Sequence, residues 1–132
     1  VGKLLPELAG KLTGNSIRVP VPNVSMAILN LTVEEATTRE EVCDFLRDCS
    51  LNSAMQRQID YTESSEVVSS DFVGNRHACI IDGHATIVNG QQMVLYVWYD
   101  NEFGYSCQVV RCAQKMAGIH YPLVPKQPAS AE

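Results

Sequence analysis

The sequence predicts an α+β fold, with a mostly antiparallel, mixed sheet and helices packed on one face of it. A capped helical pattern begins at Thr38, alternating or β-branched segments lie on both sides of it, and a second helical pattern ends at Gly118. Helices and strands that do not alternate one to one along the chain are typical of α+β domains. With 132 residues, 45% of them hydrophobic, the chain can form one modest core.

The first ten residues have the pattern of a helix end. Leu4, Leu5 and Leu8 lie at helical spacing, and Gly10 is a natural stop. The chain opens with Val1 instead of an initiator Met and enters this helical pattern at once. We therefore expect the chain to be a fragment that starts within a helix of a longer protein.

Two extended segments follow. Residues 16–21 predict a strand, and Pro20 and Pro22 keep its backbone extended while removing two hydrogen-bond donors, as expected of an edge or site-lining strand. Residues 24–33 alternate in polarity, with a shift at Leu29. They predict a longer strand that buries one face more deeply than the other.

A helix is predicted to begin after Thr38. Thr38 and Glu41 form a capping-box pattern, in which the threonine accepts from the Glu41 backbone and the glutamate side chain reaches back. The apolar stripe that should face the sheet consists of Val42, Phe45, Leu46 and Cys49. Residues 50–58 are polar and weakly patterned, which predicts a loop.

The second half of the chain predicts a hairpin and a final helix. Asn89 and Gly90 tolerate positive φ and predict a type I′ turn, after which the strand returns over residues 92–99. A helix is predicted over residues 104–117, with Gly118 as its stop. Its apolar stripe consists of Val109, Cys112, Ala113 and Met116. Four further segments are short strand candidates: 59–62, 67–69, 77–81 and 85–88.

Charge and cysteine content narrow the function classes. A net charge of -5 with no basic cluster argues against nucleic-acid binding, and the longest apolar runs, such as residues 93–99, are too short to cross a bilayer. An odd number of cysteines without a Cys-x-x-Cys pair favours reduced core residues over metal ligands. The five are Cys43, Cys49, Cys79, Cys107 and Cys112. We expect a soluble, cytoplasmic protein without nucleic-acid or membrane partners.

The segment WYDNEFGYS, residues 98–106, joins a hydrophobic strand to a helix through polar residues. Strand-to-helix junctions often carry sites, because a rigid scaffold positions their side chains. The residues alone favour a structural interpretation, in which Asp100 and Asn101 cap the helix and the aromatic residues fill the core. A functional site is the alternative.

The same segment resembles a motif of the phosphorylating glyceraldehyde-3-phosphate dehydrogenases. Two other blocks are similar to that family and occur in its order. The first runs from VGK through LTG to IRVPVPNVS over residues 1–25, and the second contains YTE and VVSSDF over residues 61–72. The resemblance covers residues 1 to about 117 and indicates the C-terminal part of the catalytic domain.

The resemblance implies a glycolytic aldehyde oxidation in which a cysteine thiolate attacks the aldehyde and a histidine acts as base. Hydride then passes to NAD or NADP, and inorganic phosphate releases the acyl group. The family's nucleophile, base and Rossmann domain have no counterpart here, and no G-x-G-x-x-G occurs. We therefore expect residues 1–118 to be a partial catalytic domain without catalytic residues, and residues 119–132 an exposed, Pro-rich tail. The parent would be a homo-oligomer, and the fragment alone would be inactive and bind no cofactor tightly.

Four residues match positions with known roles in that family. Arg18 aligns with an anion-binding arginine, whose planar guanidinium can hold phosphate oxygens through paired hydrogen bonds. Asn101 aligns with the residue whose amide fixes the nicotinamide carboxamide. Tyr105 aligns with an aromatic residue near the nicotinamide ring, and Glu102 with a polar neighbour of uncertain role. The three histidines, His77, His84 and His120, fit turns or the tail better than a catalytic role.

Departures from the family pattern leave two alternatives open. Residues 50–60 lack the family's usual Gly-Ile-Leu-Gly-Tyr-like run, and the segment after residue 117 is longer than usual. Residues 80–83 and the hairpin also look similar to erythrose-4-phosphate dehydrogenase, which acts on a different phosphorylated aldehyde. A non-catalytic assembly or interaction module is the alternative from another functional class.

Overall fold

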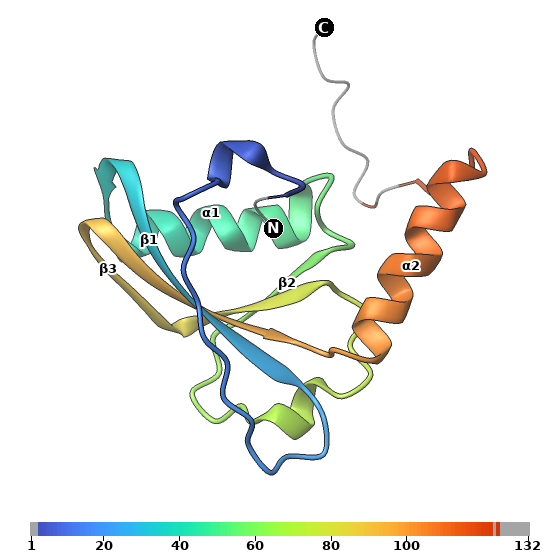
Figure 1. Cartoon of the computed structure of the whole chain (residues 1–132), viewed down its shortest axis with the longest axis horizontal. Coiled ribbons are helices and arrows are strands. Elements are labelled where there is room, and N and C mark those ends of the chain that lie inside the picture. The colour runs from blue at the N-terminus through green and yellow to red at the C-terminus, as the bar shows by residue number, and fades with distance from the viewer. Residues whose placement is uncertain (1–2, 123, 125–132) are drawn as a thin grey trace, which may run out of the picture.

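The computed structural model describes residues 3–122 and 124 of the chain, and Figure 1 shows its arrangement. One helix covers a twisted sheet, and a second helix extends away from the end of the sheet. The elements are a 3₁₀ helix (Pro6–Leu8), β1 (Ser25–Thr37), α1 (Arg39–Asn52), β2 (Ile59–Thr62), a second 3₁₀ helix (Ser69–Phe72), β3 (Cys79–Tyr99) and α2 (Phe103–Met116).

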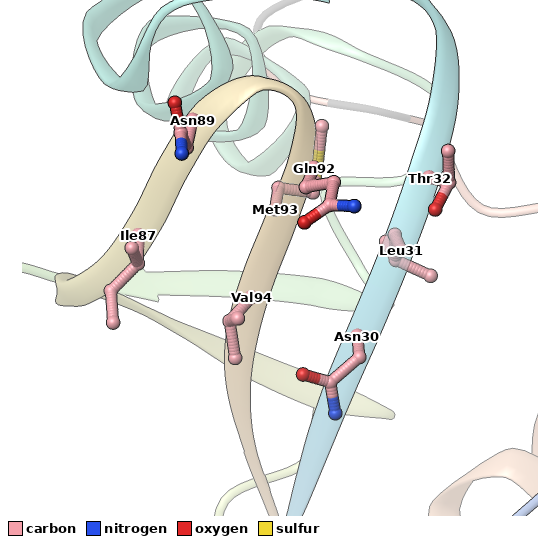
Figure 2. A pocket seen from close by; sticks show the side chains of 8 residues that line it. All are labelled: Asn30, Leu31, Thr32, Ile87, Asn89, Gln92, Met93 and Val94. Carbon is pink, nitrogen blue, oxygen red and sulfur yellow. The ribbon is translucent and has the colours of Figure 1, made fainter.

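The sheet has the order β1-β3-β2 and is mixed. β1 runs antiparallel to the second half of β3, from the pair Ser25 and Tyr99 onward, whereas β2 runs parallel to its first residues. β3 can take part in both pairings because it bends back on itself, as Figure 2 shows between Asn89 and Gln92. The predicted α+β class with a mixed sheet is confirmed.

The bend of β3 lies where the hairpin was predicted, but the predicted type I′ turn is wrong. That turn needs positive φ at both central residues. Gly90 has φ of +62°, but Asn89 does not have positive φ. Among the described non-glycine residues, only Val24 does. The ladder of β1 reaches into the bend, where Thr37 pairs with Gly90 after a register shift between Thr32 and Thr37.

Side-chain alternation along β3 divides the core between the two faces of the sheet. On the α1 face, Ile81, Met93 and Leu95 are buried beneath the helix, together with Val97. On the other face, Ile80 packs with Val24 and Phe72. Neighbouring strand residues point to opposite faces, so Ile80 and Ile81 belong to different clusters. The stripe predicted for the first helix faces the sheet only in part: Val42 and Leu46 pack on the core, whereas Phe45 is 68% exposed.

Several expected elements near the N-terminus are wrong. Residues 16–21 are extended but exposed, and they pair with no strand among the described residues. Pro20 in this segment and Pro22 just after it account for this, since proline cannot donate to a ladder. In place of the expected helix end there is a single 3₁₀ turn, followed by Gly10 at φ of +76°.

Two later expectations also need correction. Residues 67–69 form no strand: Val67 packs against the cluster around Phe72, and a 3₁₀ helix starts at Ser69. The predicted loop at 50–58 starts later, because α1 continues to Asn52. The hydroxyl of Ser50 donates to the backbone oxygen of Arg47, and the hydroxyl of Ser53 donates to that of Cys49. The backbone of Ser53 is extended, which ends the helix.

The second helix differs from its prediction in packing. α2 begins and ends close to the predicted residues, and Gly118 has φ of +71°. Its apolar stripe is nevertheless largely exposed, with Met116 at 89% and Cys112 also exposed. Cys112 therefore is not a core residue, whereas Cys43 is buried as expected. All five cysteines are free thiols.

Within the described part of the chain, no helix combines the length and hydrophobicity that a membrane span requires. The tail predicted for residues 119–132 lies mostly outside the described residues, since only 119–122 and 124 belong to them.

Candidate functional site at the end of β3

The junction between β3 and α2 is organised by Asp100, whose side chain is only 2% exposed. Its carboxylate accepts backbone hydrogen bonds from Gly74 at 2.9 Å, Glu102 at 2.9 Å and Phe103 at 2.7 Å. It also accepts from Asn23 Nδ2 at 3.1 Å. Desolvation, the largest single influence, raises the pKa of Asp100, but the hydrogen bonds from Gly74, Phe103, Glu102 and Asn23 together outweigh it and lower the pKa. The group is therefore a carboxylate that joins three segments of the chain.

Two features let α2 start close to this carboxylate. The residue at the formal N-cap position, Glu102, makes no capping bond through its side chain, so Asp100 satisfies the first helical N–H groups. Gly104 is buried, and a Cβ there would lie 3.0 Å from the backbone oxygen of His77 and 3.3 Å from that of Asn75. The absence of a side chain at Gly104 thus allows the first turn of α2 to pack directly on this loop.

Asn101 follows the buried carboxylate and is exposed. Its Oδ1 accepts a hydrogen bond of 3.2 Å from Ser25 Oγ, and Ser25 is the β1 partner of Tyr99. No described residue accepts from Asn101 Nδ2, so this end of the amide remains able to donate to a ligand. An amide held at one end and open at the other fits a carboxamide, which has both a donor and an acceptor.

Glu102, the N-cap residue of α2, and Tyr105, in its first turn, follow Asn101 closely in the sequence. Tyr105 is 68% exposed, and its ring is available to contact a planar group. Glu102 is exposed, and its backbone oxygen accepts from Ser106 Oγ at 2.8 Å. The structure thus brings three of the four predicted site residues together at one junction.

The fourth predicted residue, Arg18, lies in the extended segment before β1 and is exposed. It forms no hydrogen bond or ion pair with any described residue. Its phosphate-binding role stays a prediction.

The histidines show no catalytic arrangement. His77 Nδ1 lies 2.9 Å from Asn75 Oδ1 and 3.5 Å from Asp60 Oδ2, and Asn75 Nδ2 donates to the same Asp60 oxygen at 3.0 Å. These contacts hold the loop on which α2 starts. Across the described residues no cysteine is hydrogen-bonded to a histidine, and no group of acidic, histidine or cysteine side chains is arranged to hold a metal.

Two open hollows in the surface lie away from this junction. One, of about 350 Å³, lies over β1 and the bend of β3 and is lined by amide and apolar side chains, including Asn30, Asn89 and Gln92 (Figure 2). The other, of about 310 Å³, lies between α1 and the sheet and is lined by Phe45 and Leu95 among others. Neither contains a predicted site residue.

Sequence reasoning assigned Asp100 to a helix cap and did not identify its wider role. The pattern of Asn23 and Ser25 carries no sign of the contact with residues 100 and 101, which lie more than 75 positions further along the chain. Only the β1–β3 register brings these segments together. The segment IRVPVPNVS, which includes Asn23 and Ser25, was identified only through its similarity to the family motif.

The fold and the junction define an α+β domain with a polar, partly exposed junction at the end of its central strand and no nucleophile–base pair in its described part. A sequence model described as "Glyceraldehyde 3-phosphate dehydrogenase, C-terminal domain" matches residues 1–101. The match covers more than half of the chain, and the chain belongs to this family.

Curated proteins agree with this assignment. A glyceraldehyde-3-phosphate dehydrogenase-like protein of Pseudomonas aeruginosa is 63% identical over 124 residues, which are 94% of this chain and 27% of the relative. The glyceraldehyde-3-phosphate dehydrogenase of Borreliella burgdorferi is 49% identical, over 88% of this chain and 35% of its own length. A cytosolic enzyme of that name from Chlamydomonas reinhardtii is 46% identical, over 89% of this chain and 34% of the relative. The chain thus spans about a third or less of these relatives.

Proposed function

We propose that this chain is the part of a phosphorylating glyceraldehyde-3-phosphate dehydrogenase that positions the substrate phosphate and the nicotinamide. The observation that carries the proposal is the anchored, outward-facing amide of Asn101 at the β3–α2 junction. Family membership supports it, and so do the relatives' names, which favour glyceraldehyde 3-phosphate over erythrose 4-phosphate. The nucleophilic cysteine, the basic histidine and the Rossmann domain would come from other parts of the protein.

Each residue has a defined task in this proposal. Asn101 holds the nicotinamide carboxamide and thereby fixes which face of the nicotinamide ring accepts hydride. Acceptance of hydride is the chemistry that NAD or NADP supplies when bound. Tyr105 contacts the ring from α2, and Glu102 is a polar neighbour without an assigned role. Arg18 binds a phosphate through its planar guanidinium. Positioning of this kind lowers the barrier only when the reacting groups are present, so the isolated chain should be inactive.

A homo-oligomeric, cytoplasmic parent enzyme completes the proposal. The exposed apolar side chains of α2, such as Val109, Val110 and Met116, are consistent with burial against the remainder of the enzyme or a second subunit. A cytosolic relative supports the location.

Substitution of Arg18 in the full-length enzyme tests the phosphate assignment. Arg18→Lys keeps the charge but loses the paired geometry, and Arg18→Ala loses both. Charge-assisted hydrogen bonds contribute about 1.5 to 3 kcal/mol each, so the alanine variant should lose about tenfold to a hundredfold in kcat/KM, with lysine between it and wild type.

Unphosphorylated glyceraldehyde is the control substrate for these variants. The loss should shrink greatly with it, because the arginine then has no phosphate to bind. Equal losses on both substrates would show that Arg18 is structural and would remove it from the site.

A further inference from the structure

We propose that Ser25 is a positioning residue that fixes the orientation of the Asn101 amide, and that the buried Asp100 carboxylate holds Ser25 at the required distance. The inference rests on the proposed function, because it gives Ser25 a task at the nicotinamide site. It adds to that site two residues that touch neither substrate nor cofactor and act through Asn101.

Asp100 connects the start of β1 with the start of α2. Its carboxylate accepts from Asn23 Nδ2 at 3.1 Å, and also from the backbone of Glu102 and Phe103 on the other side of Asn101. The start of β1 and the start of α2 are therefore tied to one buried group. Asn101 lies between the two points of attachment, so its backbone position depends on both.

The backbone between Asn23 and Ser25 is strained at Val24. Val24 has φ of +73°, a left-handed conformation that β-branched residues rarely adopt. It is also buried, at 5% exposure, against Phe72 and Ile80. Strain of this kind persists only where surrounding contacts enforce it, and it is concentrated at functional sites. Here the strained residue lies between the one that binds Asp100 and the one that binds Asn101.

The hydrogen bond from Ser25 restrains the Asn101 amide. An asparagine amide can rotate by half a turn and exchange its oxygen and nitrogen at little cost when it is exposed. The hydroxyl of Ser25 donates to Oδ1 at 3.2 Å, which restrains rotation of the amide plane and leaves Nδ2 without a partner among the described residues. The oxygen keeps a second lone pair, so the amide can both donate to and accept from a carboxamide. A fixed amide edge determines which ring face is presented.

A matched pair of substitutions in the full-length enzyme isolates the hydroxyl. Ser25→Thr keeps it, and Ser25→Val has nearly the same shape without it. The measurements are the Kd for NAD by calorimetry and the fraction of deuteride transferred to the wrong face of the ring, by NMR, from C1-deuterated substrate.

We expect Ser25→Val to raise the Kd for NAD about threefold to tenfold, as the loss of one neutral hydrogen bond predicts. It should also produce a measurable fraction of wrong-face transfer, whereas Ser25→Thr should behave as wild type. Thr32→Val, which removes a hydroxyl elsewhere on the same strand, is the control and should leave both measurements unchanged.

Asn101→Ala separates the two levels of the hypothesis. If it changes Kd and stereospecificity while the threonine and valine variants at position 25 match each other, the positioning role of Ser25 is overturned and the proposed function stands. If Asn101→Ala changes neither measurement, the nicotinamide assignment fails and the inference fails with it. If Ser25→Val acted by disturbing the fold, Ser25→Thr should weaken NAD binding and stereospecificity to the same extent. Equal losses in both variants would therefore also overturn the role of the hydroxyl.

Discussion

The two helices of the chain begin in different ways. α1 is capped by its own sequence: Thr38 accepts from the backbone of Glu41 at 3.2 Å, and Glu41 accepts from the backbone of Thr38 at 3.0 Å. α2 is capped by Asp100, which also binds Asn23, 77 positions away in the sequence. The first cap is exposed and local, and the second is buried and joins distant segments. A local cap therefore stabilises one helix, whereas the buried cap couples a helix to the site next to it.

The helices also differ in how they use their apolar stripes. α1 packs on the sheet, and a side chain at its start, Arg39, donates to the backbone oxygens of Gly83 at 2.6 Å and Thr86 at 3.1 Å. α2 leaves the sheet at its first turn (Figure 1) and exposes most of its stripe. Both stripes have the same helical periodicity. Periodicity thus shows that a helix has an apolar face, but the partner of that face depends on the tertiary structure.

The largest expected effect is at Asp100. Asp100→Asn removes the charge and turns a donor toward backbone N–H groups that need an acceptor, so the free energy of unfolding should fall by about 3 kcal/mol. Urea unfolding followed through the fluorescence of Trp98, the single tryptophan, measures it. A fall below about 1 kcal/mol would contradict the central role of this carboxylate.

The pH dependence of this difference gives a second criterion for the same variant. The pKa of Asp100 is lowered in the folded chain, so its stabilisation is fully present above the unfolded value of about 3.9 and is lost as pH falls through the folded value. The stability gap between wild type and Asp100→Asn should be constant near neutral pH and shrink below about pH 4.

These two caps also show what sequence reasoning could reach. The capping box at Thr38 and the extent of α2 were predicted, because each depends on residues close together in the chain. A strand also needs a partner, which the local pattern of residues does not supply: the strand predicted at 59–62 pairs with β3, whereas the one predicted at 16–21 pairs with no described strand and was not correct. Asn101, Glu102 and Tyr105 were found through resemblance to a family motif. Ser25 could not be linked to Asn101 without the β1–β3 register.

A smaller effect is expected at Gly104. Gly104→Ala would place a Cβ 3.0 Å from the His77 carbonyl oxygen, and a backbone group can move little to make room. The better helix propensity of alanine, about 1 kcal/mol, offsets part of this cost. We expect a net loss of about 1 to 2 kcal/mol in the free energy of unfolding.

A matched control for this variant is Gly90→Ala at the bend of β3, where an added Cβ meets no atom within 4 Å but φ is +62°. Its cost would come from backbone strain alone and should not affect the cofactor. In the full-length enzyme, Gly104→Ala should therefore raise the Kd for NAD more than Gly90→Ala does. An unchanged Kd for both would show that the start of α2 is not coupled to the site.

The smallest effect is expected at Thr38, and it completes the comparison. Thr38→Ala removes the side-chain acceptor for the Glu41 N–H and should cost about 1 kcal/mol, typical of an exposed N-cap. Thr38→Ser keeps the hydroxyl and should retain most of the stability. Because this cap contacts only its own helix, neither variant should alter the Kd for NAD, in contrast to substitutions around Asp100. If Thr38→Ala weakened NAD binding as much as Gly104→Ala, the distinction between a local and a coupled helix start would be wrong, and any loss of stability in this chain would disturb the site equally.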